Sequence, residues 1–281
     1  MSHQSDHFPV LGIQEFNENK SPVCHLLFNE LHGERSIDEP HKHDFFIINL
    51  FETGKGSHTI DFVKYAVEDH QIHVVFPDQV HQWVIEKETI GYQLMISREW
   101  FESFLPALRF SASYYQNHPV IHLSGEIYQL LLYEFRAIQR ELNGGNIFWE
   151  LIQKRSELIG LLISKSVEGV FKDFEMYHSN PIISRFLNLI DVHFKEERSV
   201  SFYADKLNIS PNYLNIVCKK NLKASASSLI QNRILLEAKR LLKVSEMSVK
   251  DIVYDLGFYD HASFSKFFKA QTGMTPSQFK E

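Results

Sequence analysis

Residues 253–276 read VYDLGFYDHASFSKFFKAQTGMTP, and residues 204–219 read ADKLNISPNYLNIVCK. Ala204–Ile209 aligns with Val253–Phe258, and each copy reads as a helix, a tight turn and a second, capped helix. Beyond a one-residue insertion in the second copy, the apolar and basic positions also align: Leu214, Cys218 and Lys219 with Phe264, Phe268 and Lys269. This is the helix-turn-helix arrangement. Many helical bundles contain one such turn, so the duplication makes the signal specific.

The second helix of each copy is apolar on one face and mostly polar on the other. The apolar positions are Leu214, Val217, Cys218, Phe264, Phe267 and Phe268. The opposite faces carry Asn212, Asn215, Ile216, Lys219, His261, Ser265, Lys266 and Lys269. Short amides, hydroxyls and cations suit base edges and phosphates in a major groove. The pattern therefore predicts a surface for double-stranded DNA.

The charge of the chain is unevenly distributed. From Pro181 to Glu281 there are 15 Lys and Arg against 10 Asp and Glu, a net charge of +5. The first 180 residues carry 14 basic and 25 acidic residues, a net charge of −11. A basic segment indicates a polyanionic partner. Chance clustering on a solvated face is the alternative explanation.

Outward from the repeat, residues 181–281 are predicted to be helical throughout. Helix starts are marked by N-cap side chains or by Pro at the first helical position, at Ser210, Pro211, Ser248, Asp260, Thr275 and Pro276. The expected helices cover residues 182–197, 201–207, 211–221, 227–243, 248–256, 260–271 and the chain from 275 onward. Residues 171–180 are predicted to be a linker.

Residues 181–281 resemble the DNA-binding domain of the AraC/XylS family of transcription regulators. The resemblance rests on LNISPNYL (207–214), Arg233 with EAKRLL (237–242), LGFYD (256–260) and FSKFFKAQTGMTPSQF (264–279). It implies two helix-turn-helix units, joined by the long helix, that enter adjacent major grooves of double-stranded DNA. It also implies RNA polymerase as a further partner, as for an activator.

Carried over by position, the resemblance implies which residues read bases: Asn212, Asn215 and Ile216 in the first unit, and His261, Ala262, Ser265 and Lys266 in the second. Lys219 and Lys269 are expected to contact DNA from the same faces. Two positions depart from the family pattern. Leu222-Lys223 replaces the Gly that usually ends the first recognition helix. Ile216 stands at a position that is often basic. It is therefore expected either to contact a thymine methyl group or to make no base contact.

Residues 1–124 are predicted to form a β-barrel. Short strands separated by turn residues favour an antiparallel sandwich or barrel, and they are expected at residues 45–51, 58–62, 73–76, 82–85 and 92–96. The first of them is apolar on both sides, with Phe46, Ile48 and Leu50 on one and Phe45, Ile47 and Asn49 on the other. One set must line the interior, because side chains alternate along a strand. The fold class is therefore α+β, with two domains.

His41-Lys-His43, Gly54-x-Gly56 and Pro77-x-x-x-His81 resemble the cupin-type, jelly-roll sensor domain of many such regulators. The resemblance implies a pocket for a small-molecule effector, with His41, His43, Phe46, Ile48, His81 and Trp83 as its expected lining. Metal-binding cupins add a Glu after the second His, but residues 45–49 hold no carboxylate. The three histidines still offer a set that zinc or iron accepts. We expect the metal-free arrangement and no cofactor.

Residues 125–170 are predicted to form a helical hairpin. Apolar positions at helical spacing mark two faces, Ile127, Leu130, Leu131, Phe135, Ile138 and Leu142 in the first helix and Phe148, Leu151, Ile152, Leu158, Ile159, Leu162 and Ile163 in the second. The Gly144-Gly145 connection is short and makes the helices antiparallel. Either both faces pack on the barrel, or the apolar surface that the barrel leaves uncovered pairs with a second subunit. We expect a homodimer.

Other functional classes lack support in the sequence. No apolar run approaches the roughly 18–20 residues that span a bilayer, and residues 1–30 lack the regions of a signal peptide. Cys24 and Cys218 form neither a disulfide framework nor a zinc motif. These observations favour a cytoplasmic protein with no membrane partner.

The sequence contains no paired carboxylates, nucleophile elbow or phosphate-binding Gly loop that would indicate an enzyme. We therefore predict no catalytic residue. The expected function is that of a sequence-specific transcription regulator whose barrel senses a small molecule and dimerises. One alternative is a regulator without an effector, controlled by a protein partner or by its own abundance. The other is an oxygenase or isomerase built on the barrel, which would need a bound metal and turnover.

Overall fold

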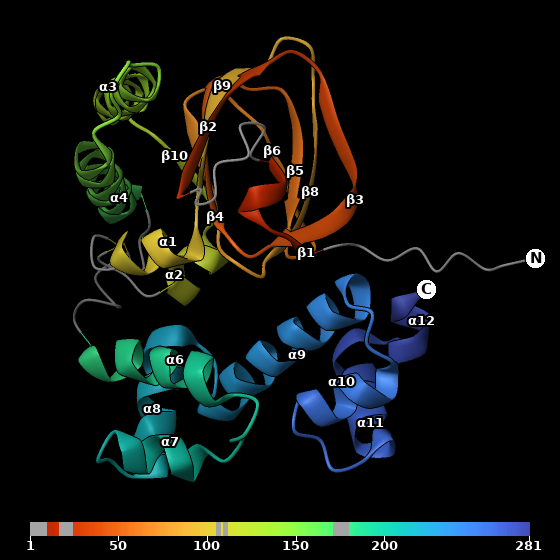
Figure 1. Cartoon of the computed structure of the whole chain (residues 1–281). Coiled ribbons are helices and arrows are strands. Elements are labelled where there is room, and N and C mark those ends of the chain that lie inside the picture. Colours follow the sequence, from red (N-terminus) through yellow and green to blue (C-terminus); the bar gives the residue numbers. More distant parts are fainter. Residues whose placement is uncertain (1–9, 17–24, 105–107, 109–111, 171–179) are drawn as a thin grey trace, which may run out of the picture. The chain divides into compact units, whose positions relative to one another are not determined.

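The computed structural model describes residues 10–16, 25–104, 108, 112–170 and 180–281. They divide into two compact units, one within Val10–Phe174 and the other within Glu175–Glu281 (Figure 1). The first unit contains the β-structure and two long helices, and the second is helical. The expected two-domain α+β class is therefore confirmed. The predicted linker, except Asn180, lies outside the described residues.

The first unit is a sandwich of two five-stranded sheets, with strand orders β1-β3-β8-β5-β6 and β10-β7-β4-β9-β2. Apart from the parallel β1–β3 pair, the strands pair antiparallel. The strands are β1 Val10–Leu11, β2 Leu26–His32, β3 Arg35–His43, β4 Phe46–Thr53, β5 Gly56–Ile60, β6 Val63–Ala66, β7 Gln71–Val75, β8 Val80–Ile85, β9 Ile90–Ile96 and β10 Val120–His122. A 3-10 turn, η1, covers Ile13–Phe16.

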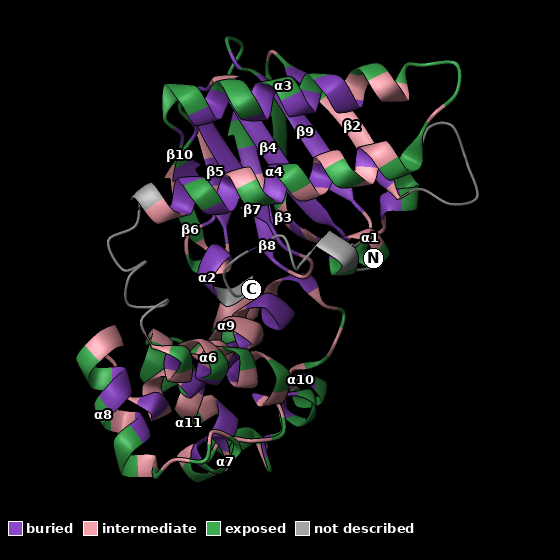
Figure 2. Ribbon diagram, turned by 90° about the vertical axis from the view of Figure 1, so that its left-hand side faces the viewer, coloured by how far each residue is buried: buried purple, intermediate pink, exposed green. Residues whose placement is uncertain are grey.

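Strand β4 is buried on both sides because helices cover the outer face of its sheet. Figure 2 shows helices α3 and α4 lying across these strands. Phe28 on β2 and Tyr92 on β9 both contact the ring of Phe135 on α3. Two short helices that the sequence pattern did not predict, α1 (Arg98–Phe104) and α2 (Ala112–Asn117), belong to the same unit.

The side chains of Phe46 and Ile48 lie on this helix-covered face, which corrects their predicted place in the barrel pocket. The ring of Phe46 stacks on Phe101 of α1, with centroids 4.8 Å apart. Ile48 is in register with Val74 and Leu94, on the same sheet face. The interior is instead lined by the odd-numbered residues: Phe45, just before β4, and Ile47 on β4 pack with Ile60 of the opposite sheet.

The predicted hairpin is formed by α3 (Gly125–Leu142) and α4 (Trp149–Val170). Ser124 caps α3 by accepting a hydrogen bond from the backbone of Ile127. Leu131 and Ile159 are completely buried within this unit. Packing on the barrel therefore explains much of the apolar surface, and the residues that stay exposed are considered below.

The second unit consists of seven helices over residues 180–281. They are α6 Pro181–His193, α7 Val200–Lys206, α8 Pro211–Leu222, α9 Ala226–Val244, α10 Val249–Asp255, α11 His261–Thr272 and α12 Pro276–Lys280. All of the predicted N-caps are present, at Ser210, Ser248, Asp260 and Thr275. One apolar cluster runs through both helix-turn-helix units.

The aligned positions of the two units play the same roles. Leu214 and Cys218 of α8 and Phe264 and Phe268 of α11 are all completely buried. In the two turns, Asn208 and Gly257 align, and both have positive φ, 55° and 70°. A tight helix-turn-helix turn thus uses a left-handed residue at the same place in each unit, and the sequence repeat is a structural repeat.

The predicted departure at Lys223 has a structural consequence. Lys223 ends α8 in the left-handed conformation with φ 54°, where Gly273 ends α11 with φ 78°. This conformation costs a residue with a side chain about 1–2 kcal/mol. The Lys223 ammonium donates a hydrogen bond to the carbonyl oxygen of Lys220, at the end of the same helix.

Within the described ranges, no helix combines the length and apolar character that a membrane span requires.

Candidate functional site

The polar face of α8 lies on the surface of the second unit. Pro211 and the Ser210 cap start this helix, and Leu214, Val217 and Cys218 anchor its opposite face in the core. As a result, Asn212, Ile216 and Lys219 are exposed. These three predicted DNA contacts lie on the accessible side of the helix.

Asn215 lies differently from the other predicted readers of α8. It is half-buried, its side-chain nitrogen donates to the Pro211 carbonyl, and its side-chain oxygen accepts from the backbone N–H of Ala226. Ala226 is the first residue of α9. The amide of Asn215 therefore joins α8 to the start of α9, and these hydrogen bonds indicate a structural role.

The polar face of α11 is likewise accessible. His261, Ala262, Lys266 and Lys269 are exposed, and Ser265 is half-buried. Asp260 caps the helix by accepting from the Ser263 backbone, 2.7 Å away. The hydroxyl of Ser265 lies 3.3 Å from Nδ1 of His261. All five predicted contacts of this helix reach its surface side.

Neither recognition helix contains an acidic residue, while each contains two lysines. Elsewhere in this unit, some cations pair with acids. Lys195 bonds Asp255 at 2.8 Å, and Arg233 bonds both Asp191 and Glu237, at 3.1 and 2.9 Å. Helices α8 and α11 thus each expose positive charge with no acid on the same helix, and a polyanion would be attracted there.

The turn of the second helix-turn-helix unit is held by the loop between α6 and α7. The guanidinium of Arg198 lies 3.6 Å from the ring centroid of Phe258 and donates to the carbonyl of Leu256. A side chain at Gly257 would place its Cβ 2.1 Å from the carbonyl oxygen of Lys195. The sequence pattern did not single out Arg198, because a lone arginine in a loop carries no motif.

A band of polar side chains crosses the barrel interior, and we call it the polar belt: the half-buried Asn29 and the buried Asn49, His58, His73 and Gln93. Asn29 donates to Gln93 at 3.1 Å, and Gln93 donates to Asn49 at 3.0 Å. Apolar clusters flank the belt, one around Phe45 and one around Trp83. None of the belt residues was predicted, although Asn49 stands out as the one polar residue in strand 45–51.

Histidines continue the belt from one sheet to the other. Nδ1 of His73 lies 3.0 Å from Nδ1 of His58, and Nε2 of His58 lies 3.0 Å from Nδ1 of His81. Burial lowers the pKa of His58 to about 3, and it lowers the pKa values of His73 and His81 well below the usual range. These imidazoles are therefore neutral at neutral pH.

The structure brings together three residues of the predicted pocket: His41, His43 and His81. Each is at most 5% exposed, and one ligand atom from each lies within 4.8 Å of the others. Trp83 also faces the interior, where its ring centroid lies 5.7 Å from that of His58. We refer to the three histidines as the histidine triad.

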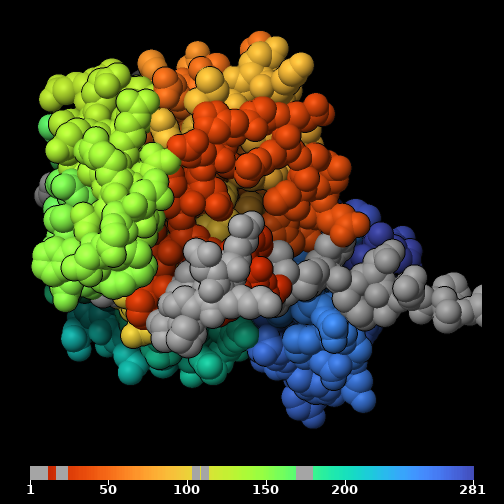
Figure 3. Space-filling model, turned by 45° about the horizontal axis from the view of Figure 1, so that its top comes forward, coloured from red at the N-terminus to blue at the C-terminus, as the bar shows by residue number. Residues whose placement is uncertain are grey.

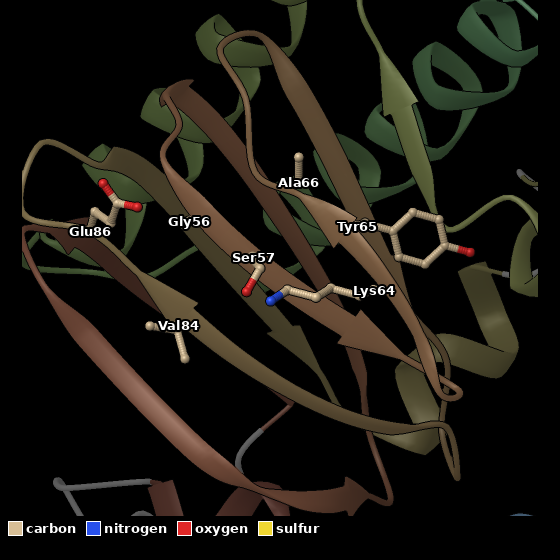
Figure 4. Close-up of a pocket in the computed structure, with 7 residues that line it drawn as sticks. All are labelled: Gly56, Ser57, Lys64, Tyr65, Ala66, Val84 and Glu86. Atoms are coloured by element: carbon tan, nitrogen blue, oxygen red, sulfur yellow. The ribbon is translucent and has the colours of Figure 1, made fainter.

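A separate, open pocket of about 330 Å³ lies on the outer face of the sheet that contains β5, β6 and β8 (Figure 4). Ser57, Lys64, Val84 and Glu86 contribute to its lining. Ser57 and Val84 are in register on neighbouring strands, on the face opposite to His58 and Trp83. None of the predicted effector residues lines this pocket.

The fold, the exposed recognition helices and the polar interior of the barrel define a class of protein: a helix-turn-helix transcription regulator joined to a jelly-roll barrel. Residues 203–281 match the family model of a helix-turn-helix domain, and residues 27–148 match that of an AraC-like ligand-binding domain. The chain belongs to the AraC family of transcription regulators, as the resemblance predicted.

Relatives of similar length support the assignment. The arabinose operon regulatory protein of Salmonella typhimurium is 23% identical over 257 residues, covering 87% of this chain and 86% of the relative. The transcriptional activator RhaS of Escherichia coli is 23% identical over 252 residues, covering 86% and 87%. Among solved structures, the C-terminal domain of AraT from Geobacillus stearothermophilus is 29% identical, covers 36% of this chain and 84% of that chain, and has a TM-score of 0.35.

Proposed function

We propose that the barrel of this AraC-family regulator senses a small, neutral, polar molecule and that binding alters how the second unit binds DNA. The polar belt carries the proposal. A barrel interior that served only stability would be filled with apolar side chains, whereas this one contains Asn49, His58, His73 and Gln93, all almost completely buried.

The chemistry of the belt indicates the class of ligand. Among the described residues, the side-chain nitrogen of Asn49 and the indole nitrogen of Trp83 are buried without a hydrogen-bond partner. Both are donors, so they suit a ligand with hydroxyl or carbonyl oxygens. The imidazoles around them are neutral and the first 180 residues are net acidic, which disfavours an anion. Figure 3 shows a hollow between the strands on one face of the barrel.

A thermal-shift screen of metabolites with the full chain tests the sensing role. We expect a polar compound that raises the melting temperature of the wild type and changes its affinity for DNA, because a ligand shifts only states that it binds differently. Asn49→Leu removes a belt amide and should abolish both effects. Ile48→Val, at the neighbouring residue on the helix-covered face, is the matched control and should keep them.

A compound that stabilises Asn49→Leu as strongly as the wild type would show that the belt is not the binding site. If no compound in a broad library acts, the alternative function remains: a regulator controlled by a protein partner or by its own abundance.

For DNA binding, we propose that α8 and α11 enter adjacent major grooves of the duplex. The supporting observation is that both belong to one compact unit and both present acid-free polar faces. The proposed contacts are Asn212, Ile216, Lys219, His261, Ala262, Ser265, Lys266 and Lys269. A regulator of this kind acts in the cytoplasm and, as an activator, contacts RNA polymerase. We assign it no catalytic role.

We further propose that the hairpin holds a homodimer. After packing on the barrel, α3 and α4 and the loop between them still expose large apolar side chains: Leu130, Tyr133, Phe148, Trp149, Leu158 and Leu161. Leu158 and Leu161 lie one turn apart on α4. Clustered apolar exposure of this kind is typical of a subunit interface.

The double variant Leu158→Glu/Leu161→Glu should convert the dimer to a monomer, because it buries charge at the apolar contact. Sedimentation of the full chain measures the change. Lys87→Glu, at an exposed position of the barrel outside the hairpin, is the charge control and should remain dimeric. Leu131 and Ile159 are unsuitable positions because they are buried within their own unit. A wild type that sediments as a monomer at micromolar concentration would disprove the dimer.

A further inference from the structure

The orientation of the Gln71 side chain is fixed by the backbone. Its oxygen accepts a hydrogen bond from the backbone N–H of Glu68 at 2.9 Å, and a backbone N–H can only donate. The same oxygen lies 2.9 Å from Nε2 of His73. Because a carbonyl oxygen can only accept, the proton of His73 must be on Nε2. This assignment sets the protonation of the histidines that follow.

A neutral imidazole carries a single N–H, so the assignment passes from ring to ring. With its proton on Nε2, His73 accepts at Nδ1 from the Nδ1–H of His58. His58 then accepts at Nε2 from the Nδ1–H of His81. His81 is left with a lone pair on Nε2. Among the described residues, this buried nitrogen has no hydrogen-bond partner.

The same reasoning applies to His41. Its Nδ1 lies 3.1 Å from the carbonyl oxygen of Glu39, so Nδ1 carries the proton and Nε2 carries a lone pair. The rings of His41 and His81 have their centroids 4.4 Å apart, and that of His43 lies 4.7 and 4.9 Å from them. The barrel thus gathers three imidazoles, two of them with a lone pair on Nε2.

We propose that the histidine triad binds a divalent transition metal of the zinc class. Three imidazole nitrogens suit Zn²⁺ and its neighbours, whereas Mg²⁺ and Ca²⁺ require oxygen ligands. Tetrahedral zinc at 2.0–2.1 Å separates its nitrogen ligands by about 3.3 Å. The ligand atoms lie within 4.8 Å of one another, so modest ring rotations bring them together. Within the described residues, the group includes no carboxylate or thiol, and a fourth position stays open.

The chain of Gln71, His73 and His58 acts as a positioning device for this metal. Metal-bound histidines usually donate their second ring N–H to an acceptor, which fixes the ring and raises its basicity. Here the acceptor of His81 is another histidine, and the chain of donors ends at an amide on the far sheet. The inference is independent of the sensing role, because the triad can hold a metal whether or not binding changes DNA affinity.

Titration of the metal-free full chain with Co²⁺ tests the proposal, since tetrahedral cobalt has a strong visible absorption. We expect one Co²⁺ per chain, displaced by Zn²⁺. His81→Gln should weaken binding at least 100-fold, whereas His32→Gln, at an exposed histidine of the same unit, should have no effect. Gln71→Leu leaves every ligand in place but removes the terminal acceptor, and it should weaken binding about 10- to 100-fold.

Circular dichroism identifies variants that fail to fold, and His41→Gln replaces His81→Gln if that variant does. Stoichiometric binding that is lost in the triad variant and weakened in Gln71→Leu supports the site. A wild type that binds no Co²⁺ would overturn the proposal, as would binding unchanged by substitution of His81 or His41. Binding that depends on the triad but not on Gln71 would overturn the positioning role alone.

Discussion

Gly257→Ala is expected to lower the free energy of unfolding of the second unit by about 3–5 kcal/mol and to abolish DNA binding. Gly257 has φ 70°, a conformation that disfavours any side chain. The added Cβ would also lie 2.1 Å from the carbonyl oxygen of Lys195. The Lys195 backbone cannot easily move away, because the Lys195 side chain is ion-paired with Asp255. Arg198 also fixes this loop by its hydrogen bond to Leu256 and its contact with the Phe258 ring.

The aligned residue of the first unit separates the two causes. Asn208 has φ 55° and already carries a Cβ, so Asn208→Ala should cost only about 1 kcal/mol of backbone strain. Urea unfolding of the full chain, followed by circular dichroism, measures both variants, and a mobility shift measures DNA binding. Equal destabilisation by the two substitutions would show that the collision with Lys195 contributes nothing. The barrel should unfold as in the wild type.

The affinity of the full chain for its genomic sites should fall about 10³- to 10⁵-fold between 50 and 200 mM salt, if six to ten phosphates are contacted. The cations of α8 and α11 contribute to this effect because no acid on either helix neutralises them. Lys219→Ala should weaken binding to all sequences alike and reduce the salt slope by about one. Lys266→Ala should cost about 1–3 kcal/mol and relax the preference at one base pair.

Binding isotherms at several salt concentrations, with duplexes varied at single base pairs, distinguish the two lysines. Lys87→Ala removes an equal charge from an exposed position of the barrel and should leave the salt slope unchanged. Binding that is insensitive to salt would contradict the proposed surface. A base preference unaltered by Lys266→Ala would place that residue against the phosphates.

Local chemistry explains why the second unit could be predicted in detail. Ser210, Ser248, Asp260 and Thr275 each cap the helix that follows, and a cap depends on atoms only three residues away. The repeat added the alignment of Leu214 with Phe264 and of Asn208 with Gly257. Such signals are contained in short stretches, so the sequence by itself determined the two helix-turn-helix units, their exposed faces and the class of protein.

Tertiary contacts decided the rest. Asn215 has the spacing of a base reader, but its amide bonds Ala226 of the next helix. Both faces of β4 carry large apolar side chains, and only the helices on one side show that Asn49, rather than Phe46 or Ile48, faces the barrel interior. The histidine chain joins residues from three strands and ends at His81. Periodicity gives the spacing of side chains along one strand, whereas burial and hydrogen bonding depend on which other strands and helices pack against it.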